Sequence, residues 1–331
     1  MKINKQAILG CIVSILFLIL IFYNIDLREL LIIFKNFNFQ NMLLIFVLYG
    51  ISLIVRTLRW FILLKCESRY NFYNLFYTWV IGNLMNAFLP ARAGDVWRAC
   101  SIGANSQESK VKLFGSVILE RIFDGVSICI LLYICIIRYA DISWLKHLAN
   151  LSMLMFGGIL LGVYLIIRFN KLEETCVFFE GLSSKTILNF KGIINDFLRH
   201  LRRLFNLFVS GFESLKSCKY TIAAIFFSFS VWGVECLITY IVINSFNINC
   251  PISAALLVIC FVAFGTMIPS SSIFIGPYQY AFILALSLYS IDKAEALAMS
   301  IINQSILISA LLIFSLVLVV FNCVKIIKIR K

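Results

Sequence analysis

The sequence predicts an all-α integral membrane protein, with about six full transmembrane helices, two re-entrant or broken helices and an inverted repeat. Hydrophobic residues make up 62% of the 331 positions and charged residues only 14%, and the mean hydropathy is +0.97. An ordinary soluble domain carries roughly one quarter charged residues and could not bury this much apolar surface. Long apolar runs and two segments that end in proline support the same prediction.

Six apolar runs are long enough to cross the roughly 30 Å hydrocarbon core of a bilayer, which takes about 20 helical residues. They cover residues 7–23, 42–64, 113–137, 148–167, 220–246 and 295–321. The first run follows Lys2 and Lys5 as a signal peptide would, but no small-x-small cleavage site follows it, so we interpret it as a retained span. We expect all six to be full transmembrane helices of one polytopic domain, residues 1–331.

Two further apolar segments, residues 72–90 and 252–269, each end at a proline followed by small or polar residues. Such interrupted segments are typical of re-entrant helices that line a transporter cavity. If both re-enter and the N-terminus is cytoplasmic, 21 of the 29 lysines and arginines lie inside and five outside, in agreement with the positive-inside rule. Both termini are then cytoplasmic, and the first half, 1–168, is inverted relative to the second, 220–331. Ordinary spans that happen to end in proline are the alternative.

The longest polar stretch, residues 169–219, lies between the two halves. Apolar residues recur in it at helical spacing, at Ile193, Ile194, Phe197, Leu198, Leu201, Phe205 and Phe208. Arginines occupy the other faces, so the pattern predicts a basic amphipathic helix on the anionic cytoplasmic leaflet. A helix that caps the bundle is the alternative.

The passage from residue 83 to residue 98 carries the first candidate site. It contains Asn86, Pro90, Arg92, Gly94, Asp95 and Arg98. Proline ends a helix, glycine permits a turn, and arginine makes forked contacts with phosphate or carboxylate oxygens. We expect these residues to bind an anionic headgroup. An ordinary basic loop with Trp97 anchored at the interface is the alternative.

Charged residues inside the apolar spans form the second candidate group. Glu120, Arg121 and Asp124 lie close together on one helix, and each charge costs about 2.5 to 3.5 kcal/mol at mid-membrane. We therefore expect them to line a substrate or proton pathway, with Glu120, Asp124 and Glu235 as candidate proton carriers. The alternatives are a neutral, hydrogen-bonded Glu235 and a purely structural network with Arg56, Arg59 or Arg92.

The matching passage of the second half is polar but uncharged. Pro269 is followed by three serines, Ser270 to Ser272, and then by Gly276 and Pro277. We expect these residues to line a headgroup path or to satisfy the ends of broken helices.

Motifs for metal, nucleotide or nucleophilic chemistry are absent from the sequence. It has no phosphate-cradling glycine-rich loop, no H-E-x-x-H and no nucleophile elbow, and its eleven cysteines form no C-x-x-C pair. We therefore expect no metal and no cofactor. The net charge of +13 comes from loops and chain ends, so we expect no nucleic-acid partner.

These residues resemble the transmembrane, flippase-like region of lysylphosphatidylglycerol synthases and its stand-alone relatives. The similarity runs from about residue 42 to residue 321 and depends on Asn86 to Arg98, Glu120 to Asp124, and Pro269 with Gly276 and Pro277. The resemblance implies a flippase or transporter that moves a polar or anionic glyco- or aminoacyl-lipid across the cytoplasmic membrane. It also implies membrane lipids as ligands and a separate lipid synthase or glycosyltransferase as a partner.

Two other functions compete with lipid transport. Ten residues, 322–331, follow the last span, so we do not expect the soluble aminoacyl-transferase activity in the family's name. A membrane-embedded lipid transferase could use Asp95, Glu120 or Asp124 as its base, but the sequence has no donor-binding motif and no histidine within a span. A scaffold that recruits a synthase through residues 169–219 is the third hypothesis.

Overall fold

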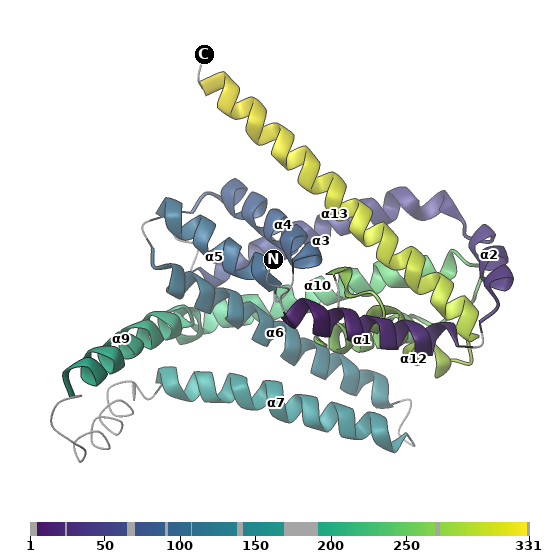
Figure 1. Ribbon diagram of the computed structural model, residues 1–331, viewed down its shortest axis with the longest axis horizontal. Helices are drawn as coiled ribbons and strands as arrows, with labels where there is room; N and C mark the ends of the chain where they lie inside the picture. Colours follow the sequence, from purple (N-terminus) through teal and green to yellow (C-terminus); the bar gives the residue numbers. More distant parts are fainter. Residues whose placement is uncertain are drawn as a thin grey trace.

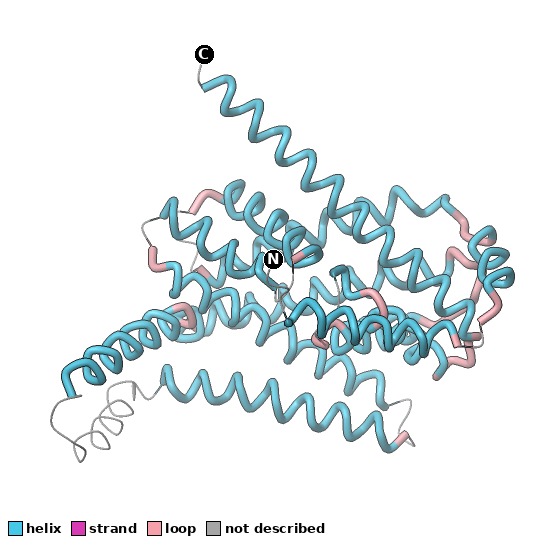
Figure 2. The backbone as a smooth tube through the Cα atoms, viewed as in Figure 1, coloured by secondary structure: helices cyan, strands magenta, loops and turns pink. Residues whose placement is uncertain are grey.

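The protein is a bundle of long helices (Figure 1) joined by short loops (Figure 2). The computed structural model describes residues 5–23, 25–64, 70–89, 92–106, 108–137, 142–168, 191–268 and 272–329. The α-helices are α1 (Lys5–Phe22), α2 (Leu27–Lys35), α3 (Met42–Leu63), α4 (Phe72–Phe88), α5 (Ala93–Ser106), α6 (Lys110–Ile136), α7 (Ser143–Arg168), α9 (Lys191–Ser210), α10 (Cys218–Asn244), α11 (Ile252–Gly265), α12 (Pro277–Ser287) and α13 (Lys293–Ile329). Short 3-10 helices are η1 (Phe39–Asn41), η4 (Glu213–Lys216) and η5 (Ser272–Phe274). The predicted all-α class is confirmed.

Several helices have the length and composition of membrane spans. Among the described residues, four helical stretches are long and apolar enough to cross a membrane: Phe39–Leu63, Ser143–Ile166, Cys218–Asn244 and Lys293–Cys323. Helix α6 is as long as α10, at 27 residues, but carries several charges. The six predicted spans lie on α1, α3, α6, α7, α10 and α13, and the two interrupted segments lie on α4 and α11. The protein is therefore a multi-pass membrane protein.

Helix starts follow the chemistry of the residues just before them. Asp26 precedes α2, and its carboxylate accepts a hydrogen bond from the Arg28 amide at 2.8 Å. Asn71 precedes α4 and accepts from the Tyr73 amide at 2.9 Å. These side chains satisfy amides that have no partner within the helix. Helix α12 instead begins at Pro277, whose missing N–H would have had no partner there.

Helices α3 and α10 run antiparallel through the middle of the bundle. Just before α3, the Asn38 amide donates to the Ser245 carbonyl just after α10, at 2.8 Å. Near the end of α3, the Arg59 guanidinium donates to the Ser228 hydroxyl in the first half of α10, at 3.0 Å. The residue numbers rise along α3 while those of its partners fall, so the two helices run in opposite directions. This is the relation expected for corresponding helices of an inverted repeat.

Two helical hairpins, α4–α5 and α11–α12, flank this central pair. Helices α5 and α11 pack against α6, whereas α4 and α12 pack against α13. In Figure 1, α4 and α5 lie to the left of α12 along the long axis of the bundle. Each hairpin therefore contacts both α6 and α13. The second helix of each hairpin packs on the long helix of its own half, and the first helix packs on that of the other half, as an inverted repeat predicts.

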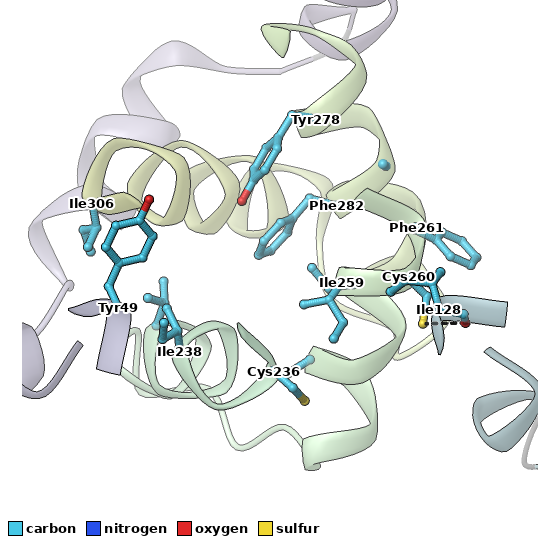
Figure 3. Close-up of a cluster of buried hydrophobic side chains, with 14 of the residues drawn as sticks. Tyr49, Ile128, Cys236, Ile238, Ile259, Cys260, Phe261, Tyr278, Phe282 and Ile306 are labelled. Atoms are coloured by element: carbon cyan, nitrogen blue, oxygen red, sulfur yellow. Dashed lines mark hydrogen bonds between the residues drawn. The ribbon is translucent and has the colours of Figure 1, made fainter. Parts of the chain in front are cut away.

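An apolar core fills the space between the helices of the second half and α3. Tyr49, Ile238, Ile259, Phe282 and Ile306 converge there from α3, α10, α11, α12 and α13 (Figure 3), and each is at most 7% exposed. Lipid chains are as apolar as these side chains, so burial from lipid supplies little driving force. Close packing and dispersion hold this core together.

The C-terminal end of α9 packs on the bundle through α6. The ring centroid of Phe208 lies 6.4 Å from that of Phe114, and a Cβ at Gly115 would lie 2.2 Å from the Phe208 carbonyl oxygen. Residues 169–190 and the side chains of 191–199, which carry much of the predicted amphipathic pattern, lie outside the described residues. The membrane-surface position of this segment stays a prediction.

Candidate functional site

Glu120 lies in the middle of α6 with no exposed surface, and three other helices donate hydrogen bonds to it. Arg59 of α3 and Arg98 of α5 donate to its two carboxylate oxygens at 2.8 Å each. The Trp79 indole of α4 donates at 3.3 Å. A carboxylate is stable in a protein interior only when it is paired and hydrogen-bonded. Glu120 meets that condition and connects α3, α4 and α5 to α6.

Four further contacts close these residues into a ring of alternating charge, which we call the charged ring. Its members in order are Arg59, Glu120, Arg98, Asp95, Arg121 and Asp124. The shortest nitrogen–oxygen distances around it are 2.8, 2.8, 4.0, 2.9, 3.7 and 2.5 Å. Three positive and three negative groups cancel, and this pairing offsets much of the free energy of placing charges in an apolar bundle.

The α4–α5 hairpin holds Asp95 in its place in the charged ring. The Asn86 side-chain amide donates to the Asp95 carboxylate at 2.9 Å, and its oxygen accepts from the Asp95 backbone amide at 3.1 Å. Arg121 donates to the same carboxylate through two nitrogens, at 2.9 and 3.2 Å. A Cβ at Gly94 would lie only 1.9 Å from the Gly82 carbonyl oxygen. The two helices can therefore approach this closely only because residue 94 is glycine.

Arg98 is fixed by a tryptophan as well as by Glu120. Its guanidinium carbon lies 4.6 Å from the Trp60 ring centroid, at cation–π distance. The Trp60 indole in turn donates to the Ser116 hydroxyl at 3.1 Å. The Nε atoms of Arg98 and Arg59 are buried and have no hydrogen-bond partner among the described residues. The ring thus retains donors that its own carboxylates do not use.

A separate ion pair joins α3 to α10. Arg56 donates to Glu235 at 2.9 Å, and the Ser52 hydroxyl donates to the same carboxylate at 2.9 Å. The Arg56 guanidinium lies 5.8 Å from the ring centroids of both Trp79 and Trp232. The side chains of the pair are 15% and 14% exposed, so this pair is less deeply buried than Arg59 and Glu120.

Arg92 adds a positive charge that the charged ring does not neutralise. It precedes α5 in the left-handed region, with φ of 52°, an uncommon backbone conformation for a residue with a side chain. No described carboxylate lies within 4.0 Å of its guanidinium nitrogens, although Arg92 precedes Asp95 by only three residues. Arg121 is the most exposed member of the ring, at 27% of its side chain. Arg92 and Arg121 together form what we call the charged edge.

Exposed apolar side chains lie next to Arg92 along the chain. Phe88 and Leu89 precede the hairpin loop and are each 42% exposed, and Val96 follows it at 49%. The charged edge therefore has apolar residues of the same hairpin close to it in sequence. A surface of this kind suits a ligand with a polar head and an apolar tail.

The structure brings most of the residues predicted for the first half into one network. These are Asn86, Asp95, Arg98, Glu120, Arg121 and Asp124, with Gly94 at the hairpin contact and Arg92 beside them. Gly276 and Pro277 lie instead at the start of α12, in the other hairpin. Pro90 and Pro269 lie outside the described residues.

The three candidate proton carriers all accept hydrogen bonds from arginines. Glu120 accepts from two, Asp124 from Arg59, and Glu235 from Arg56. Nearby positive charges stabilise the ionised carboxylate. Proton coupling through these residues stays a prediction. Among the residues that the structure describes, no group of three or more His, Cys, Asp or Glu could hold a metal ion.

Sequence patterns treat Arg59 only as a structural partner and do not single out Trp60 or Trp79. A charge inside a span requires a partner, so the sequence contained a usable signal for Arg59. The two tryptophans gave no comparable signal, because aromatic residues are common at the ends of membrane helices.

The helices and the charged ring define an all-α, multi-pass membrane protein with ionised groups inside its bundle. Residues 7–320 match the family described as the lysylphosphatidylglycerol synthase TM region, and the chain belongs to that family. It is similar to the UPF0104 membrane protein MJ1078 of Methanocaldococcus jannaschii, with 26% identity over 234 residues that cover 71% of this chain and 92% of the relative. No solved structure matches the chain. The family resemblance predicted from the sequence is confirmed.

Proposed function

We propose that this protein is a flippase or transporter that moves a polar, anionic lipid, such as a glyco- or aminoacyl-lipid, across the cell membrane. In this proposal both chain termini lie on the cytoplasmic side, because that topology puts 21 of the 29 basic residues there. The α4–α5 hairpin then opens toward the cytoplasm. Membership of a family named for the membrane region of lipid synthases supports a lipid ligand.

The Arg92 guanidinium, which has no carboxylate within 4.0 Å among the described residues, is the observation that carries the proposal. The charged ring is neutral, and Arg92, three residues before Asp95, adds one positive charge to it; Asp95 in turn pairs with Arg121 at 2.9 Å. Two guanidiniums that repel each other are stabilised by an anion between them, and arginine binds phosphate through forked hydrogen bonds. The phosphate of a lipid headgroup therefore fits the charged edge.

The apolar residues near the charged edge favour a lipid over a free anion. Phe88, Leu89 and Val96 expose 42 to 49% of their surface and lie within four positions of Arg92. A headgroup bound at Arg92 can keep its acyl chains among these side chains and in the surrounding bilayer. A soluble anion would gain nothing from them.

Transport can be tested in proteoliposomes with phosphatidylglycerol labelled by a dithionite-sensitive fluorophore on one acyl chain. Dithionite bleaches only the outer leaflet unless the protein exchanges lipids between leaflets. We expect Arg92→Gln to slow exchange at least about tenfold, because a hydrogen bond to a charged group contributes about 1.5–3 kcal/mol. Lys110→Gln is the matched control, since Lys110 is exposed at the start of α6.

Two results would contradict the proposal. One is folded wild-type protein that exchanges no anionic lipid. The other is an Arg92→Gln variant as active as Lys110→Gln, because a surplus charge without a ligand would then have no role in transport.

The geometry favours transport over the competing transferase hypothesis. The candidate bases Asp95, Glu120 and Asp124 are all members of the charged ring and are paired with arginines. A general base has to take a proton from its substrate, and a carboxylate held between guanidiniums is a weak base. Binding and positioning of an anion need no such proton transfer.

A further inference from the structure

The α11–α12 hairpin and α13 enclose a second buried polar group, which the proposed function does not use. Its members, which we call the amide cluster, are Tyr278, Gln279, Asn303 and Gln304, and none is more than 8% exposed. The Asn303 side-chain amide donates to the Tyr278 hydroxyl oxygen at 2.8 Å. The Gln279 amide donates to the Gln304 oxygen at 2.5 Å. All four side chains are uncharged.

The amide cluster corresponds to the charged ring under the inverted arrangement of the hairpins. In the ring, residues of α5 contact Glu120 and Arg121, which are neighbours on α6. In the cluster, residues of α12 contact Asn303 and Gln304, which are neighbours on α13. Corresponding helices therefore carry polar groups at corresponding places. The difference is that amides and a phenol stand where the first half has charges.

The same amides hold an unusual backbone in front of α12. Ile273, Phe274 and Gly276 have φ values of 65, 58 and 100°, a left-handed region that a β-branched residue rarely adopts. The Gln304 side chain donates to the Ile273 carbonyl at 2.5 Å, and the Gln279 oxygen accepts from the Gly276 amide at 2.8 Å. Strained backbone that is fixed by surrounding groups is typical of ligand sites.

Hydrogen-bonding capacity is left over at the centre of the amide cluster. Asn303 is 2% exposed, and its Oδ1 atom has no partner among the described residues. The Tyr278 oxygen accepts from Asn303 and keeps its own proton to donate. Figure 3 shows the Tyr278 hydroxyl pointing into the bundle, on the side of Phe282. If the Asn303 side-chain amide were flipped, its oxygen would face Tyr278 and its NH2 group would be the one without a partner. A ligand group that both donates and accepts hydrogen bonds therefore fits either orientation of the amide.

The second hairpin also resembles the first in its exposed apolar residues. Met267, Ile268 and Ile275 are 43, 39 and 41% exposed, on either side of the loop before α12. They correspond to Phe88, Leu89 and Val96 of the first hairpin. Acyl chains can therefore lie near both polar groups.

We propose that the amide cluster binds hydroxyl groups of the lipid headgroup, so the substrate class is an anionic lipid whose headgroup carries free hydroxyls. This inference rests on the proposed function. The charged edge binds the phosphate near one hairpin, and the amide cluster accepts the hydroxylated part near the other. Hydroxyl groups both donate and accept hydrogen bonds, which matches Asn303 Oδ1 together with the Tyr278 hydroxyl. An uncharged site holds such a headgroup less tightly than the charged edge, which suits release.

Two lipids of equal charge test this specificity in the leaflet-exchange assay. Phosphatidylglycerol and phosphatidylmethanol share one anionic phosphate, but only the first carries free hydroxyls. We expect wild-type protein to exchange phosphatidylglycerol about tenfold faster, the effect of about one net hydrogen bond. Asn303→Leu should bring the two rates close together by slowing phosphatidylglycerol. Arg92→Gln should slow both lipids and preserve their ratio.

Tyr278→Phe serves as the second variant, since it removes a single oxygen atom and should fold where Asn303→Leu does not. Thermal denaturation of each variant establishes that it is folded. If folded Asn303→Leu and folded Tyr278→Phe both keep the tenfold preference for phosphatidylglycerol over phosphatidylmethanol, the amide-cluster proposal is overturned and lipid transport is left standing. Wild-type protein that exchanges neither lipid would overturn the proposed function and this inference together.

Discussion

Replacing Glu120 by glutamine measures how much the charged ring stabilises the fold. Glutamine keeps the size of the side chain and still accepts from Trp79, but it removes the charge that Arg59 and Arg98 share. Each contact of 2.8 Å corresponds to about 6 kcal/mol of Coulomb attraction at an effective dielectric constant near 20. Desolvation offsets part of it, and removing one partner of a buried pair destabilises a protein by about 3–5 kcal/mol. Arg98 loses most, because its next carboxylate, Asp95, is 4.0 Å away.

The matched control is Glu235→Gln. The Arg56–Glu235 contact has nearly the same length, 2.9 Å, but its side chains are 15% and 14% exposed, whereas Arg59 and Glu120 are fully buried. Because this pair is partly exposed and Glu235 accepts from one arginine where Glu120 accepts from two, the loss in the control should be smaller than in Glu120→Gln.

Free energies of unfolding in mixed detergent micelles, followed by tryptophan fluorescence, should separate the two variants by about 2 kcal/mol or more. Equal losses, or a larger loss in the Glu235 variant, would refute the argument that burial sets the contribution of the ring.

Three further outcomes follow from the packing and the topology. Gly94→Ala should lower the free energy of unfolding by about 1–3 kcal/mol, and with it the melting temperature, because the new Cβ would lie 1.9 Å from a backbone oxygen. The control Gly157→Ala, whose Cβ has nothing within 4 Å, should be neutral or stabilising. Trp60→Phe should cost about 1–2 kcal/mol in the same thermal assay, since it loses the indole hydrogen bond and weakens the contact with Arg98, and a wild-type melting temperature would disprove this. With the exposed Cys218 as its only cysteine, the protein should react with an impermeant maleimide in inside-out vesicles and not in intact cells; the reverse would invalidate the proposed topology.

Helix positions were predictable from hydropathy, and helix ends were not. Helix α3 starts at residue 42, as predicted, but α7 starts at Ser143 instead of 148 and α13 reaches Ile329 instead of 321. Hydropathy marks the part of a helix that lies in hydrocarbon. Backbone hydrogen bonding continues a helix beyond that region through polar residues such as Lys146, which hydropathy does not count as part of a span.

The members of the candidate site were more predictable than their partners. Asp95, Glu120 and Asp124 stand out because charged residues in an apolar context need an explanation. The pairing of Arg59 with Asp124 joins positions 65 apart, and only the fold brings them together. Asn303 gave a weaker signal because an amide in a span is less costly than a charge.

The close approach of the Gly82 and Gly94 backbones has a consequence for the proposed transport. Helices α4 and α5 pack backbone to backbone at these glycines, and Asn86 joins them through two hydrogen bonds to Asp95, so they would swing as one rigid body. Asp95 and Arg98 would move with them, away from Arg121 and from Glu120 on α6. In the proposed transport, opening a passage and breaking the ring would then be a single event, and the strength of the ring's ion pairs would set how often the passage opens.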